Sequence, residues 1–181
     1  MSAAKSSNRM TFFLLAMLFL LSSIPAVMIH ARAWSDTDNT SRFDFTNSST
    51  SPRELEDQTQ TAIKREYAAA WQNMEDALSQ NRVDLVDKSF VGGERDQLLR
   101  QIDQQKKNGL SSKLDDRSHK VEFAFYSPEG TAIELHDTVE LSQETMDGGK
   151  SVHSDSTTQK YVVIFTLVGD KWKVRTLQEV Q

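Results

Sequence analysis

Residues 161–174 read YVVIFTLVGDKWKV, and this stretch decides the fold. The run from Tyr161 to Val168 is apolar on both faces, which is typical of a central strand, and Gly169-Asp170 matches a two-residue hairpin turn. If the turn closes with Val168 opposite Lys171, three pairs share one face of the sheet: Leu167 with Trp172, Phe165 with Val174, and Val163 with Thr176. We expect these pairs to form the core on which helices pack.

Two further strands are predicted before this hairpin. Residues 121–126 alternate, with Val121, Phe123 and Phe125 on one face, and the turn Ser127-Pro128-Glu129-Gly130 follows. The next strand has an inner face of Ile133, Leu135, Val139 and Leu141 and an outer face of Glu134, His136, Thr138 and Glu140. Asp147-Gly148-Gly149 is predicted as a turn, and the residues up to Ser156 as a polar connection.

Three helices are predicted before the strands. Ser51-Pro52-Arg53-Glu54 has the pattern of a helix start, with Ser at the N-cap and Pro at the first helical position. A long helix ending near Gln80 then carries one apolar stripe of Ile63, Tyr67, Trp71, Met74 and Leu78, which we expect to be core. A short helix around residues 83–90 follows, and a third runs from Glu94 to a left-handed stop at Asn108-Gly109.

The N-terminal residues predict an export segment. Residues 11–29 contain no charged side chain, follow Lys5 and Arg9, and are long enough to span the bilayer core. We expect residues 1–10 to be cytoplasmic and residues 11–33 to be a retained transmembrane anchor, while Ala31-Arg32-Ala33 leaves open a signal peptide cleaved after Ala33. Either way the rest of the chain lies outside the cytoplasm.

The tract 34–51 is rich in Ser, Thr, Asp and Asn and is predicted to be a flexible linker to a folded domain over residues 52–181. Phe43 and Phe45 stand out in it, but scattered aromatic residues in a tether mostly have no docking role.

Composition excludes several classes of function. The chain has 181 residues and no cysteine, so disulfides, thiolate nucleophiles and cysteine-based zinc sites are absent. Only Lys5, Arg9 and Arg32 are charged before Asp36; the remaining 18 basic and 26 acidic residues give a net charge of −8, the wrong sign for a nucleic-acid surface. There is no glycine-rich phosphate loop and no Gly-x-Ser-x-Gly motif.

Three helices followed by four antiparallel strands predict an α+β domain with the helices on one face of a curved antiparallel sheet. This order resembles the nuclear-transport-factor-2-like superfamily of cone-shaped (SnoaL-like) domains over residues 55–180. The residues that carry the resemblance are Tyr67-Ala68-Ala69-Ala70-Trp71, the run 161–167 and Lys171-Trp172-Lys173-Val174. Ala132-Ile133-Glu134-Leu135 and Val139-Glu140-Leu141 are also similar to the IMS domain of membrane-anchored plastid and cyanobacterial division proteins.

The resemblance implies a pocket between the first helix and the concave face of the sheet, which serves as an enzyme site in some relatives and as a protein-docking surface in others. Asp137 has the parity of the inner face, where burial would raise its pKa toward that of a general base, with Tyr67 as the matching donor. The alternative is a β-bulge that turns Asp137 to solvent, the commoner arrangement in a curved sheet.

We expect His119, His136 and His153 to be solvated, with no metal site, because no pair has metal-ligand spacing. His136 and Asp137 point to opposite faces and cannot form a dyad. The last strand is predicted to carry a basic row of Lys171, Lys173 and Arg175, beside Lys160. The row either protects a sheet edge or is a docking patch for an acidic partner or anionic lipid.

The leading hypothesis is therefore a non-catalytic, membrane-tethered, extracytoplasmic module that binds a protein or peptide and needs no cofactor. The alternative is a small lyase or isomerase with Asp137 as base and Tyr67 as donor. Homodimerisation through the sheet is compatible with both.

Overall fold

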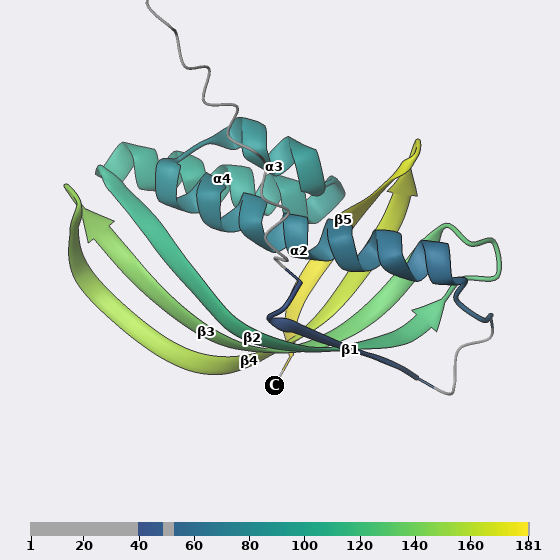
Figure 1. Ribbon diagram of the computed structural model, residues 1–181. Helices are drawn as coiled ribbons and strands as arrows, with labels where there is room; N and C mark the ends of the chain where they lie inside the picture. The colour runs from purple at the N-terminus through teal and green to yellow at the C-terminus, as the bar shows by residue number, and fades with distance from the viewer. Residues whose placement is uncertain (1–39, 49–52, 181) are drawn as a thin grey trace, which may run out of the picture. The chain divides into compact units, whose positions relative to one another are not determined.

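Three helices cover the concave face of a strongly curved five-stranded sheet in the computed structural model, which describes residues 40–48 and 53–180 (Figure 1). The strands lie in chain order: β1 (Phe43–Asn47), β2 (Leu110–Tyr126), β3 (Ala132–Asp147), β4 (Lys150–Val168) and β5 (Lys171–Val180). β1 runs parallel to β2, and every other neighbouring pair is antiparallel. The predicted α+β class is confirmed, with one strand more than expected and a mixed sheet.

The helices are α2 (Asp57–Gln80), α3 (Val83–Ser89) and α4 (Gly92–Asn108). The predicted apolar stripe of α2 is buried as one face of the helix, consisting of Ile63, Tyr67, Trp71, Met74 and Leu78. The C-cap of α4 is Gly109, whose left-handed φ of 68° is the stop that Asn108-Gly109 predicted. Packing of the α2 stripe on the sheet buries the core.

The predicted start of the first helix is wrong. α2 begins at Asp57, with Glu56 at its N-cap and no side-chain cap, so Arg53 and Glu54 precede the helix. Arg53 packs against the β2–β3 turn instead: Nη1 donates to Pro128 O (3.2 Å) and the guanidinium lies 4.9 Å from the Tyr126 ring centre. The predicted cap residues Ser51 and Pro52 lie outside the described residues.

The predicted linker also needs correction. Residues 43–47, placed in a flexible tether, form β1, with Phe43 opposite His119 and Phe45 opposite Val121 on β2. Phe43 is 7% exposed and belongs to the hydrophobic core. Two aromatic residues at strand spacing therefore bury enough apolar area to order a polar segment, and the folded part begins before residue 52.

The last hairpin confirms most of its predicted register. Val168 lies opposite Lys171, Leu167 opposite Trp172, and Phe165 opposite Val174, but Val163 lies opposite Leu177 rather than Thr176. The shift is a bulge between Ile164 and Phe165, where Arg175 is the extra residue on β5. A similar irregularity between Phe123 and Phe125 on β2 leaves Phe125 41% exposed and buries Tyr126, so the inward orientation predicted for Phe125 is wrong.

β4 is much longer than the strand predicted at Tyr161–Val168. It begins at Lys150 directly after the Gly148-Gly149 turn, and its first half pairs with β3 alone, because β5 ends opposite Lys160. The segment expected to be a polar connection is thus the polar half of a long β3–β4 hairpin.

The predicted cytoplasmic segment, membrane anchor and cleavage site fall in residues 1–33, outside the described residues. Among the described residues, no helix has the length and apolarity needed to cross a membrane.

Candidate functional site

Asp137 is buried in the cone, on the inner face of β3. β3 has no extra residue from Ile133 to Leu141: it pairs continuously with β4, and both irregularities in its pairing with β2 lie on β2, so Asp137 shares the inward face of Leu135 and Val139. The residue is 1% exposed. The bulge alternative is therefore wrong, and parity alone gave the correct orientation.

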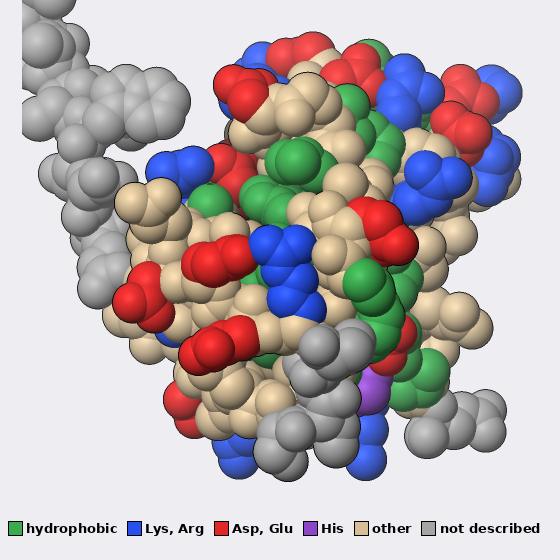
Figure 2. Space-filling model, turned by 90° about the vertical axis from the view of Figure 1, so that its right-hand side faces the viewer, with side chains coloured by type: hydrophobic (Ala, Val, Ile, Leu, Met, Phe, Trp, Pro, Cys, Tyr) green, Lys and Arg blue, Asp and Glu red, His purple; other side chains and the backbone are tan. Residues whose placement is uncertain are grey.

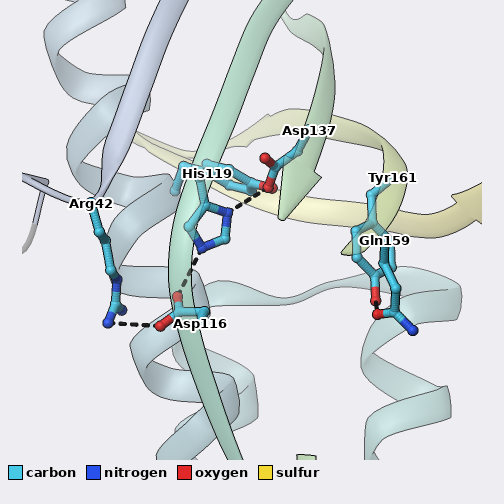
Figure 3. A network of polar contacts seen from close by, with 7 residues as sticks. Arg42, Asp116, His119, Asp137, Gln159 and Tyr161 are labelled. Atoms are coloured by element: carbon cyan, nitrogen blue, oxygen red, sulfur yellow. Dashed lines mark hydrogen bonds and ion pairs between the residues drawn. The ribbon is translucent and has the colours of Figure 1, made fainter. Parts of the chain in front are cut away.

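Two donors meet one oxygen of this carboxylate. Tyr67 Oη, from α2, donates to Asp137 Oδ2 at 2.6 Å. His119 Nδ1, from β2, lies 2.7 Å from the same oxygen (Figure 3). Burial first, and then the charge of Asp137, raises the pKa of Tyr67 well above its ordinary value. Tyr67 is therefore a neutral donor at physiological pH. The second oxygen, Oδ1, is buried and has no hydrogen-bond partner among the described residues.

The network continues through His119 to a second buried carboxylate. His119 Nε2 lies 2.9 Å from Asp116 Oδ2, and Arg42 Nη1 forms an ion pair with Asp116 Oδ1 at 2.7 Å. Arg42 directly precedes β1, so the N-terminal strand carries the outermost cation of the network. His119 is 1% exposed, and the prediction that it is solvated is wrong.

A β-bulge places Asp116 beside His119. Residues three apart on a regular strand point to opposite faces, but the register of β2 shifts between Asp116 and Ser118, so Arg117 is an extra residue. Both Asp116 and His119 consequently point inward, while Arg117 is exposed. The bulge therefore gives the imidazole a carboxylate on each side.

These contacts favour the charged form of His119. A neutral imidazole has one donor and one acceptor nitrogen, whereas both nitrogens here face carboxylate oxygens, which only accept when ionised. Burial alone would lower the pKa of His119, but the hydrogen bonds to Asp116 and Asp137 outweigh it and raise the pKa above its ordinary value. We conclude that an imidazolium bridges the two aspartates.

A third carboxyl group adjoins the network. Burial raises the pKa of Glu75, on α2, to about 8, and its hydrogen bond with Asp116 adds to the shift. For Asp116, burial acts upward, but hydrogen bonds from His119 and Glu75 and the charge of Arg42 lower the pKa. With Glu75 protonated, its carboxyl adds no negative charge beside Asp116, which is held by Arg42 and His119.

Aromatic rings close the space around the network. The Phe43 ring stacks on the His119 imidazole with centres 4.1 Å apart and planes at 14°, and the Trp71 ring lies 4.8 Å away on an inclined plane. The neighbouring space between α2 and β5 has no room for a water-sized molecule. It is lined by Tyr67, Trp71, Phe90 and Val174 among others. Among the described residues, the centre of the cone is thus filled by side chains.

The predicted basic row is divided by the register. Lys171 lies opposite Val168 at the hairpin turn, whereas Lys160 lies opposite Val180 at the other end of β5, so Lys160 is not beside the row. Lys173 Nζ donates to Asp87 O of α3 at 2.7 Å, and Arg175 is the exposed bulge residue. Lys171 and Arg175 remain as exposed cations near the turn.

Sequence reasoning missed the importance of four residues here: Arg42, Glu75, Asp116 and His119. His119 could have been found, because it continues the alternation of Val121 and Phe123 by one more step. Asp116 required knowledge of the bulge, and Arg42 required knowledge of a parallel pairing between distant segments. His136 and His153 are exposed as expected, and no group of metal-ligating side chains occurs within residues 40–48 and 53–180.

Comparison with known proteins gives one informative likeness. Neither the protein-family models nor the curated proteins contain a match to the sequence. Among solved structures, the intermembrane space region of the chloroplast protein ARC6 matches with a TM-score of 0.61 and 13% identity, covering 71% of this chain and 98% of that one. The fold is the nuclear-transport-factor-2-like cone. At this identity the likeness concerns the fold alone.

Two other matches have lower scores. A scytalone dehydratase-like protein from Novosphingobium aromaticivorans has a TM-score of 0.44 at 14% identity, covering 67% of this chain and 84% of that one. A protein from Xanthomonas campestris, similar to the calcium/calmodulin dependent protein kinase II association domain, has a TM-score of 0.43 at 14% identity. The match covers 75% of this chain and 94% of that one.

Proposed function

We propose that this chain is a membrane-tethered protein-binding module whose folded part lies outside the cytoplasm and performs no chemistry. The supporting observation is the closed network in the cone. Asp137 is held by Tyr67 and His119, and Phe43 stacks directly on the imidazole. An enzyme of this fold needs a space where substrate meets the carboxylate. Among the described residues, the space lined by Tyr67, Trp71 and Phe90 has no room for a water-sized molecule.

The proposed location follows from the sequence. Residues 11–29 are uncharged and follow two cations, so they would hold the folded part on the far side of a membrane. The matched solved structure is itself named as an intermembrane space region, which is compatible with this location. Protease added outside intact cells should then remove the folded part from a full-length, membrane-bound chain. A free product beginning near Trp34 would mean a secreted domain and would contradict the tether.

The exposed cations Lys171 and Arg175 are the proposed contact for an acidic partner. Both lie near the β4–β5 turn, where Leu167 and Val168 are also exposed, so charge and apolar area occur together. On the face that Figure 2 shows, cationic side chains lie among acidic ones, so a partner would need a matching pattern rather than uniform negative charge.

Binding can be tested in the native membrane with a photo-crosslinking amino acid in place of Asp170 at the turn. We expect one discrete adduct, which Lys171→Glu with Arg175→Glu abolishes. The matched control, Arg100→Glu with Lys120→Glu, makes the same charge change at two other exposed positions and should retain the adduct. Loss of the adduct in both variants, or no adduct in the wild type, would contradict a docking role for the turn.

A small lyase or isomerase is the second candidate, and the unpartnered Asp137 Oδ1 favours it. A carboxylate oriented through one oxygen and free at the other is suited to removing a proton next to a carbonyl. The Tyr67 hydroxyl would then turn from Asp137 Oδ2 to donate to the carbonyl oxygen of the substrate. Such an enzyme would catalyse deuterium exchange into an enolisable ketone such as cyclohexanone, and Asp137→Asn would abolish it. A non-catalytic module predicts equal, background exchange for both proteins.

A further inference from the structure

The first half of β4 has a free edge. From Lys150 to Gln159 this strand pairs only with β3, since β5 ends opposite Lys160, and at the left of Figure 1 it borders the sheet. Nine consecutive residues, Lys150–Thr158, are exposed. No described helix or strand covers this edge, so unpaired backbone groups are presented over most of its length.

The composition of the edge suits strand pairing. It consists mainly of Ser and Thr with Val152, contains no proline, and carries charge only at Lys150 and Asp155, with Lys160 beyond its end. Natural proteins usually protect such an edge with lysines, proline or bulges. Here the one lysine within the segment, Lys150, stands at the turn, and a bulge makes Val152 an extra residue near the same end, so the unprotected part of the edge runs from His153 to Thr158.

The order of side chains along the edge is self-complementary. Two identical antiparallel strands related by a two-fold axis pair each residue with a symmetry-determined partner. With the axis at Ser154, His153 faces the partner's Asp155, and Asp155 faces the partner's His153. Val152 is a bulge residue, so the regular part of this pairing is centred on His153–Asp155, and the flanking segments 150–152 and 156–158 bring no like charges together. An axis at Asp155 would instead oppose two aspartates and bring Lys150 against Lys160.

We infer that the free edge of β4 pairs with the same edge of a second copy of this chain, centred on Ser154. His153 and Asp155 lie on the face of β4 that also carries Gln159 and Tyr161, next to a hollow of about 170 Å³. Asp155 Oδ1 accepts from Ser156 N–H at 2.9 Å, and the other carboxylate oxygen is available to the imidazole across the axis. Cross-strand pairs of this kind stabilise a sheet.

The expected dimer is weak and concentration-dependent. A pair of nine-residue edges buries less than the roughly 800 Å² per partner of a typical stable interface. The inference is independent of the proposed docking at Lys171 and Arg175, which lie beyond the end of this edge, where β5 pairs with β4.

Cysteine cross-linking in the full chain tests the register, because the protein has no cysteine of its own. Ser154→Cys places two thiols opposite each other across the axis, so mild oxidation should give a disulfide-linked homodimer. Ser151→Cys is the matched control: it lies on the same exposed edge, but the two copies would be about 20 Å apart.

The charge pairs provide a second readout. In the Ser154→Cys chain, His153→Asp places the new aspartate opposite the partner's Asp155 on both sides of the axis. This repulsion should reduce the cross-link yield about five- to tenfold. Adding Asp155→His restores the complementarity and should restore the yield. Equal yields from Ser154→Cys and Ser151→Cys, no homodimer from a folded Ser154→Cys chain, or no rescue by the double charge exchange would each overturn the inference.

Discussion

The hydroxyl of Tyr67 and the hydroxyl of Tyr161 offer a direct comparison of a buried and a peripheral hydrogen bond. Tyr67 Oη donates to Asp137 inside the network, whereas Tyr161 Oη donates to Gln159 at its half-buried margin. Removing the first donor leaves a buried carboxylate with one contact fewer, so Tyr67→Phe should lower the free energy of unfolding by about 1–3 kcal/mol. Tyr161→Phe should cost about 1 kcal/mol or less, because water can replace the hydroxyl. Urea denaturation measures both, and equal costs would argue against a closed network.

Glu75 gives the network a pH dependence of defined sign. Its pKa is about 8 in the folded protein and ordinary in the unfolded chain, so the folded state binds the extra proton and loses this stabilisation as the pH rises through 8. His119 acts in the same direction, since its raised pKa gives stability that is complete below its ordinary value and lost at higher pH. The free energy of unfolding should therefore fall from about pH 4.5, the ordinary pKa of a glutamate, to about pH 8. Glu75→Gln should make this fall shallower, and an unchanged slope would contradict the assignment.

The orientation of a single strand residue could be predicted from the sequence only where the strand has no bulge. Asp137 followed from parity because β3 is regular from Ile133 to Leu141, and the pairs Leu167–Trp172 and Phe165–Val174 followed for the same reason. Counting alternate residues gave the wrong partner or face beyond a bulge, as at Val163, Phe125 and Asp116. A bulge is determined by how the curved sheet packs, and no residue pattern in this chain marked its position.

At the scale of elements, β1 is the strand that the local composition does not indicate. The residues around it are polar, and only its pairing with β2, far along the chain, shows why it is ordered. Helices α2, α3 and α4 were predictable because their apolar periodicity and glycine stop are local signals. A short parallel edge strand has no turn signal to reveal its partner.

Phe43 should account for most of the stability that β1 contributes. Phe43 stacks on His119 and is buried, whereas Phe45 stacks on Phe123 at 5.6 Å and is only partly buried. Phe43→Ala should therefore lower the free energy of unfolding by about 3–5 kcal/mol, and Phe45→Ala, the matched control on the same strand, by clearly less. Chemical denaturation at one pH suffices for the comparison. Equal effects would mean that Phe43 does not close the cone.

At the scale of the whole molecule, the curved sheet and its helical cover followed from element order, while the length of the β3–β4 hairpin did not. The polar sequence of residues 150–159 has the composition of a loop, and it is a strand because β3 continues opposite it. The same half-strand supplies the free edge proposed for self-association. Polar composition thus gave no indication of the strand or of its free edge.

The cone encloses a charged His119 between two aspartates, away from water. Long-range ¹H–¹⁵N NMR spectra of histidine-labelled protein at neutral pH test it directly, with the exposed His136 and His153 as internal references and a His119→Gln variant for assignment. We expect both nitrogens of His119 to be protonated and their protons to exchange slowly with solvent, unlike those of the two reference histidines. A neutral His119 ring, or protons that exchange as fast as those of His153, would contradict it and make the lyase or isomerase the better hypothesis.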